Sequence, residues 1–106
     1  HRDLHSFPTR RSSDLQEGPI IAQKMLSQLG FKNYIVERIC FLIGHHHTYD
    51  NIDGLDYQIL VEADFLVNLY EDDAGNRAID KAYKRIFKTE TGKKIFRLMF
   101  GYEEED

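Results

Sequence analysis

The sequence predicts an all-helical domain, and three observations lead to this prediction. Apolar residues recur three or four positions apart from residue 17 onward, which is the spacing that lines one face of a helix. Glycine, proline and asparagine stand between these periodic segments, where helices begin and end. Alternation of apolar and polar residues never extends beyond a few positions, so no strand is predicted.

The first predicted helix runs from about Pro19 to Gly30, and the second begins at Asn33. Pro19 suits a first helical turn and Gly30 a C-terminal cap, and between them the apolar residues are Ile21, Ala22, Met25, Leu26 and Leu29. Asn33 can cap the second helix. The apolar face of that helix, formed by Ile35, Val36, Ile39, Leu42 and Ile43, continues into three consecutive histidines.

Three more helices follow a polar connection over residues 48–54, in which Asp53-Gly54 is a turn. The third, Leu55 to Tyr70, is apolar nearly all the way round, which predicts a buried central helix. The fourth, about Asn76 to Lys88, and the fifth, about Gly92 to Phe100, are amphipathic.

Composition limits the classes of function. The 106 residues suffice for one domain, and 42% apolar with 30% charged residues is typical of a globular protein. A net charge of −4 argues against bulk nucleic-acid binding. Because Cys40 is the single cysteine, no internal disulfide is expected, and no apolar run is long enough to cross a membrane. We therefore expect a cytoplasmic protein without membrane partners.

The two ends of the chain differ from the rest. Residues 1–15 show no helical periodicity and resemble the translated read-through of a sequencing adapter, so we expect a disordered leader without function. For that reason His1, Asp3 and His5 are not taken as metal ligands. Residues 16–102 are expected to form the helical domain, and residues 103–106 an acidic tail.

The candidate site residues are His46, His47 and Asp64. On a helical wheel His46 lies in the middle of the apolar face if the second helix continues that far, His47 lies at its edge, and His45 lies on the polar side. Asp64 borders the apolar face of the third helix, whereas Glu62 projects to the opposite side and needs no partner.

A carboxylate in an apolar setting needs compensation, since an unpaired buried charge costs several kcal/mol or more. Two explanations for Asp64 stay open. Imidazole and carboxylate together can bind a divalent metal ion, with His46 and Asp64 as the first candidates, His47 as a ligand or a phosphate contact, and His45 as the weakest candidate. Alternatively, a hydrogen bond between histidine and aspartate closes a helix junction.

A family resemblance favours the metal. Three stretches, Glu17 to Ala22, Ile39 to His47 with its His46-His47 pair, and Ile59 to Asp64 with its Glu-Ala-Asp ending, resemble the second half of an HD-domain phosphohydrolase. The resemblance covers about residues 17–72. It implies an HD-domain-like helical bundle, truncated at its N-terminus, with Asp64 as the final metal ligand and the histidine pair as ligands of members that hold more than one ion.

The resemblance implies a reaction: divalent ions (Mn, Fe, Mg, Co or Zn) activate a water that hydrolyses a phosphomonoester or nucleotide. The expected partner is therefore a phosphorylated small molecule. The family's first histidine and its His-Asp pair would lie upstream of residue 17, and they are missing here. In some relatives a histidine occupies the place of Glu17. The stretch given is thus expected to bind metal weakly and to lack activity.

Two other interpretations of the sequence are a calcium-binding site and a function without catalysis. The segment Asp50 to Gly54 is similar to a calcium-binding loop, but Tyr49 and Leu60 would then stand at positions that require carboxylates, so a calcium site is rejected. The alternative to an enzyme is a non-catalytic helical interaction module with a structural His-Asp junction.

Overall fold

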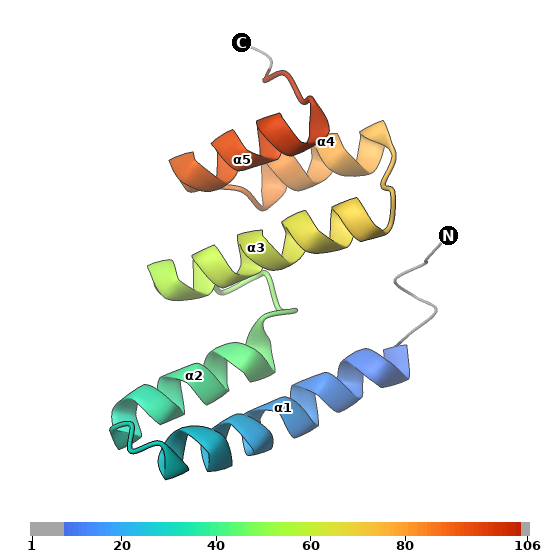
Figure 1. Ribbon diagram of the computed structural model, residues 1–106. Helices are drawn as coiled ribbons and strands as arrows, with labels where there is room; N and C mark the ends of the chain where they lie inside the picture. Colours follow the sequence, from blue (N-terminus) through green and yellow to red (C-terminus); the bar gives the residue numbers. More distant parts are fainter. Residues whose placement is uncertain (1–7, 105–106) are drawn as a thin grey trace. The chain divides into compact units, whose positions relative to one another are not determined.

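The structure, a computed structural model, describes residues 8–104, with side chains from residue 16 onward. All regular structure in this part of the chain is α-helical, as predicted (Figure 1). The helices form two units, one with α1 and α2 that ends at Thr48, and one with α3, α4 and α5 that begins at Tyr49. Within residues 8–104, no helix is long and apolar enough to cross a membrane.

Helix α1 spans Pro8–Gln28, so it begins earlier than the predicted start near Pro19. Residues 8–15, which we expected to belong to a disordered leader, are part of α1, while residues 1–7 lie outside the described residues. Pro8 occupies the first helical position, where its missing N–H costs no hydrogen bond. Each further residue then adds a helical hydrogen bond, which makes extension easier than a new start at Pro19.

The turn after α1 ends that helix as the sequence predicts. Gly30 has a φ of 87°, a conformation that disfavours residues with a Cβ. Its N–H donates to the carbonyl of Ser27 (3.1 Å), and the N–H of Phe31 donates to that of Leu26 (3.1 Å), the two bonds of a Schellman motif. The chain therefore reverses, and α2 runs back beside α1 (Figure 1).

Helix α2 spans Asn33–His45 and packs on α1. Asn33 is its first residue rather than its cap, since Lys32 occupies the N-cap position. A Cβ on Gly18 of α1 would lie 2.8 Å from the Cγ2 of Ile43, so a small residue is needed where the two helices approach. The thiol of Cys40 donates to the carbonyl of Pro19 (3.3 Å), an acceptor close to the same approach.

The second unit contains α3 (Leu55–Glu71), α4 (Asn76–Arg85) and α5 (Glu90–Phe100). Its core is largely aromatic: the ring centroid of the fully buried Phe96 lies 4.7 Å from that of Phe87 and 5.1 Å from that of Tyr83. Edge-to-face pairs at such distances stabilise a core beyond the burial of area alone. Phe65, Leu66 and Leu69 of α3 pack against this cluster.

The prediction that the third helix is buried nearly all round is wrong. Tyr57 and Val61 of α3 are buried, but Leu55, Ile59, Val67 and Tyr70 each expose half or more of their surface. The helix thus has one buried face, although its composition is apolar on both sides.

The turn between α4 and α5 also differs from the prediction. Helix α4 ends at Arg85 rather than near Lys88, and α5 begins at Glu90 rather than near Gly92. The hydroxyl of Thr89 caps α5 by accepting a hydrogen bond from the Gly92 N–H (3.0 Å). At the other end, Gly101 adopts the left-handed conformation with a φ of 58° and terminates α5.

Candidate metal centre

The three consecutive histidines lie at the C-terminal end of α2. Helix α2 ends at His45, and the N–H of Thr48 donates to the His45 carbonyl (2.8 Å), which closes a turn around His46 and His47. The orientation of His46 was inferred on the condition that the helix continues that far. Because α2 ends at His45, the helical wheel does not determine the direction of the His46 and His47 side chains. The position of His46 and His47 favours a bound cation, because the C-terminal end of a helix carries a partial negative charge.

His45 is exposed and held by its own helix. Its Nδ1 lies 2.8 Å from the carbonyl oxygen of Phe41, and its ring stacks on the Phe41 ring with centroids 4.1 Å apart. The side chain thus packs along α2, away from the half-buried pair that follows. It is the histidine that the sequence ranks last as a ligand.

His46 is half-buried, and its hydrogen bond determines its tautomer. Its Nδ1 lies 2.6 Å from the carbonyl oxygen of Ile43. Because a carbonyl can only accept, Nδ1 carries the proton, and the lone pair of the neutral ring is on Nε2. Histidines that bind metals commonly donate their other ring nitrogen to a backbone carbonyl in this way. The Nε2 atom of His46 can therefore donate its lone pair to a metal ion.

His47 is also half-buried and lies against His46. The two ring centroids are 4.0 Å apart, and the ring planes are tilted by 47°.

Asp64 lies in the middle of α3 and is half-buried rather than fully buried. Its Oδ2 accepts a hydrogen bond from the side-chain amide of Asn68, one helical turn later (3.1 Å). This bond limits the rotation of the carboxylate. A carboxylate fixed by a second side chain is a common feature of metal sites.

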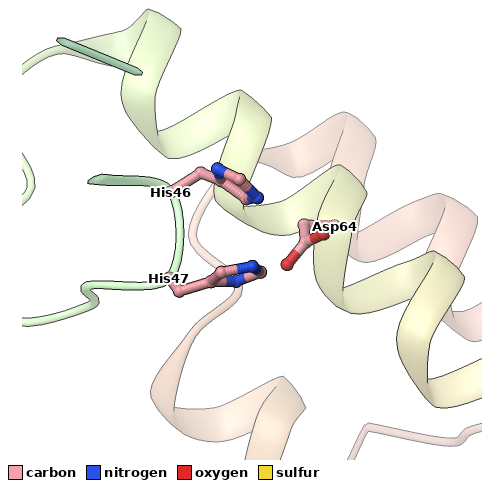
Figure 2. Close-up of side chains that lie close together, drawn as sticks. All are labelled: His46, His47 and Asp64. Carbon is pink, nitrogen blue, oxygen red and sulfur yellow. The ribbon is translucent and has the colours of Figure 1, made fainter. Parts of the chain in front are cut away.

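Figure 2 labels the side chains of His46 and His47, which follow α2, and of Asp64 on α3. The two histidines belong to the unit of α1 and α2, and Asp64 belongs to the unit of α3, α4 and α5.

Glu62 has a role that the sequence did not reveal. It is only 2% exposed, contrary to the expectation that it projects outward, and its carboxylate accepts four hydrogen bonds. The donors are the Gln58 side chain (2.6 Å), the Lys88 N–H (2.9 Å), the Thr89 N–H (3.0 Å) and the Thr89 hydroxyl (2.6 Å). Because the three donors at Lys88 and Thr89 belong to the turn between α4 and α5, Glu62 attaches that turn to α3.

The pKa of Glu62 reflects two opposing effects. Burial raises the pKa, but the hydrogen bonds from Thr89, Gln58 and the backbone of Lys88 together outweigh burial and hold it below its ordinary value. The carboxylate is therefore ionised and satisfied by protein donors. Nothing in its surroundings calls for a metal ion.

Comparison of the chain with protein-family models, curated proteins and solved structures finds no match.

Proposed function

We propose that this chain is part of a metal-dependent phosphohydrolase of the HD type, in which His46, His47 and Asp64 hold one divalent ion. The observation that carries the proposal is the orientation of the candidate ligands within each unit. The Nδ1 of His46 lies 2.6 Å from the Ile43 carbonyl oxygen, which leaves Nε2 for a metal ion, and the Asn68 amide holds the Asp64 carboxylate. Four-coordinate zinc binds such atoms at about 2.0–2.2 Å.

The donor set fits a divalent transition ion. Two imidazoles and one carboxylate suit Zn, Mn, Fe or Co better than calcium, which takes oxygen ligands. The covalent chain also allows the residues to meet. Seven residues, Thr48 to Gly54, connect His47 to α3 and can span up to about 24 Å. Asp64 lies nine residues after Leu55, or about 13.5 Å along the helix axis.

The residues around the ligands would orient them. The Ile43 carbonyl fixes the His46 tautomer, and Asn68 fixes the Asp64 carboxylate. A bound divalent ion supplies Lewis acidity toward a phosphoryl oxygen and toward water. The phosphomonoester or nucleotide substrate follows from the family resemblance, which also places further ligands upstream of residue 17. We therefore expect this stretch to bind the ion without hydrolysing a substrate.

A second candidate function is a helical interaction module in which the histidines and Asp64 are only structural. It is favoured by exposed apolar side chains at the end of α1, where Ile21, Met25 and the following Leu29 each expose more than half of their surface. Such a module needs no metal, so metal content separates the two functions.

Equilibrium dialysis of the purified chain against saturating zinc, followed by metal analysis, tests the proposal. We expect about one ion per chain for the wild type and for His45→Gln, since His45 packs on Phe41. We expect Asp64→Asn and His46→Gln to retain only a small fraction of that amount. His45→Gln is a matched control, because it removes an imidazole one residue from the proposed ligand.

Equal zinc content in the wild type, Asp64→Asn and His46→Gln would refute the metal centre and favour the interaction module. A loss in His45→Gln as large as that in His46→Gln would show that zinc binds the histidine run without the selectivity proposed.

A further inference from the structure

A second polar site lies on α5. A pocket of about 540 Å³ lies beside this helix, and the charged side chains that line it are four cations and two carboxylates. These are Lys88, Lys93, Lys94, Arg97, Glu90 and Glu104. The pocket thus has a local excess of two positive charges, in a chain whose net charge is −4. Its volume is in the range of small-molecule sites.

Two of the cations are held in place by one buried residue. Tyr83 is 4% exposed, and its hydroxyl accepts a hydrogen bond from the Nη1 of Arg97 (2.7 Å). The Nζ of Lys93 lies 5.9 Å from the centroid of the Tyr83 ring, within the range of a cation–π contact. Fixing these side chains before binding reduces the conformational entropy that a ligand must overcome.

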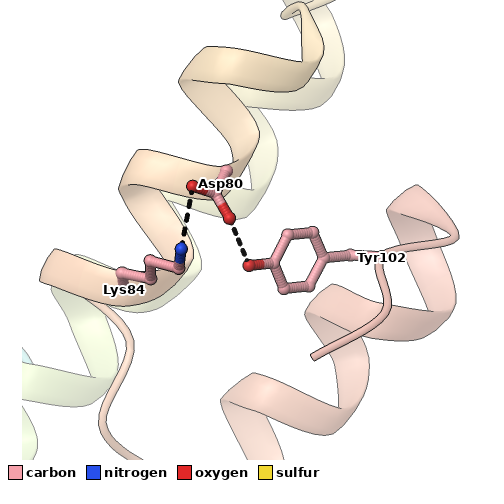
Figure 3. Close-up of polar contacts among 3 residues, drawn as sticks. All are labelled: Asp80, Lys84 and Tyr102. Carbon is pink, nitrogen blue, oxygen red and sulfur yellow. Dashed lines mark hydrogen bonds and ion pairs between the residues drawn. The ribbon is translucent and has the colours of Figure 1, made fainter. Parts of the chain in front are cut away.

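A carboxylate of the same chain already contacts the pocket's arginine. The Oε2 of Glu104 lies 3.5 Å from the Nη1 of Arg97. The segment that brings Glu104 there is attached to α4, because the hydroxyl of Tyr102 donates to Asp80 (2.6 Å), which also pairs with Lys84 at 3.3 Å (Figure 3). An anionic ligand at Arg97 must therefore compete with Glu104.

We propose that the α5 pocket binds the phosphate group of a small phosphorylated molecule, with Arg97, Lys93 and Lys94 as its main contacts and Glu104 as an internal competitor. The planar fork of arginine suits two oxygens of one phosphate, and the lysines add charge around it. A nucleic-acid backbone needs an extended basic surface, which the net charge of −4 argues against, so we do not expect it as the ligand. The proposal is independent of the metal centre, since neither His46, His47 nor Asp64 lines the pocket.

Titration of the full chain with inorganic pyrophosphate, in the absence of added metal, tests the proposal by calorimetry. We expect Lys94→Gln and Arg97→Gln each to weaken binding about fivefold, the effect of one exposed ion pair near the upper end of its usual range. Glu104→Gln is expected to strengthen binding by a similar factor, because it removes the competing carboxylate. Lys81→Gln is the matched control: it removes an exposed lysine on α4 that does not line the pocket.

Lys94 is exposed, so its substitution should leave folding intact even if Arg97→Gln disturbs Tyr83. Circular dichroism of each variant checks this. Absence of pyrophosphate binding to the wild type would overturn the proposal. So would an equal loss in Lys81→Gln and Lys94→Gln, which would indicate non-specific attraction, or unchanged affinity in Glu104→Gln.

Discussion

Glu62 and Asp64 are separated by one residue on α3, yet their surroundings differ. Glu62 is buried and accepts four protein hydrogen bonds, whereas Asp64 is half-buried and is oriented by Asn68. A buried carboxylate with several donors stabilises a fold and has no reason to bind a cation. A partly exposed carboxylate can exchange a water or a side-chain partner for a metal ion. The difference supports a structural role for Glu62 and agrees with the ligand role that we propose for Asp64.

Replacing Glu62 with glutamine should lower the free energy of unfolding by about 2 kcal/mol near pH 7, because the amide nitrogen cannot accept the bonds that the carboxylate accepts. The pKa of Glu62 is lowered in the folded state, so its contribution is present above its ordinary pKa of about 4.5 and is lost as the pH falls below it. When the pH is lowered from about 7 to about 3, the free energy of unfolding in urea should therefore fall less in Glu62→Gln than in the wild type.

Glu103→Gln is the control for this measurement, because Glu103 is exposed. It should match the wild type at both pH values. An equal pH dependence in Glu62→Gln and the wild type would show that the hydrogen bonds to Glu62 contribute no net stability.

The first turn of α5 depends on the close approach of Gly92 to the side chains of Glu62 and Thr89. A Cβ on Gly92 would overlap the Oε1 of Glu62 and lie 2.7 Å from the hydroxyl of Thr89. Both atoms belong to the hydrogen bonds that attach the turn between α4 and α5 to α3. Glycine at this place is required by space rather than by a positive φ, since no left-handed conformation is present there.

Alanine in place of glycine within a helix usually stabilises by up to about 1 kcal/mol. Gly92→Ala should do the opposite and destabilise the chain by about 1–3 kcal/mol, because the new methyl group displaces Glu62 or Thr89. Gly75→Ala is the control, since a Cβ at Gly75 meets nothing within 4 Å. Thermal unfolding of the two variants checks the prediction, and a higher midpoint for Gly92→Ala than for the wild type would contradict it.

Local sequence patterns predicted the number and order of the helices, because helical periodicity and residues such as Gly30 act over a few positions. Local patterns gave a wrong prediction where the position of a side chain depends on residues distant in the sequence. The inward position of Glu62 depends on donors 26 and 27 residues later, which no helical wheel includes. The end of α2 at His45 likewise changed the geometry of the candidate site. Residue type and family resemblance predicted His46 and His47 as ligands. The tautomer of His46 and the distance between the two rings became known only from the structure.

At the scale of the whole molecule, the two candidate sites involve different residues. The proposed metal ligands are His46, His47 and Asp64, and none of them lines the α5 pocket, which belongs to the unit of α3, α4 and α5. Variants of one site should therefore leave the other unaffected, since no residue is shared. The proposed hydrolase function depends on the metal centre.

Crystals of the chain grown with zinc, with anomalous diffraction recorded at the zinc absorption edge, test this claim most directly. We predict a peak within about 2.0–2.2 Å of the His46 Nε2 and of an Asp64 carboxylate oxygen, the usual zinc–ligand distances. A zinc peak that contacts only one of these two residues, or no peak beside either of them, would contradict the claim.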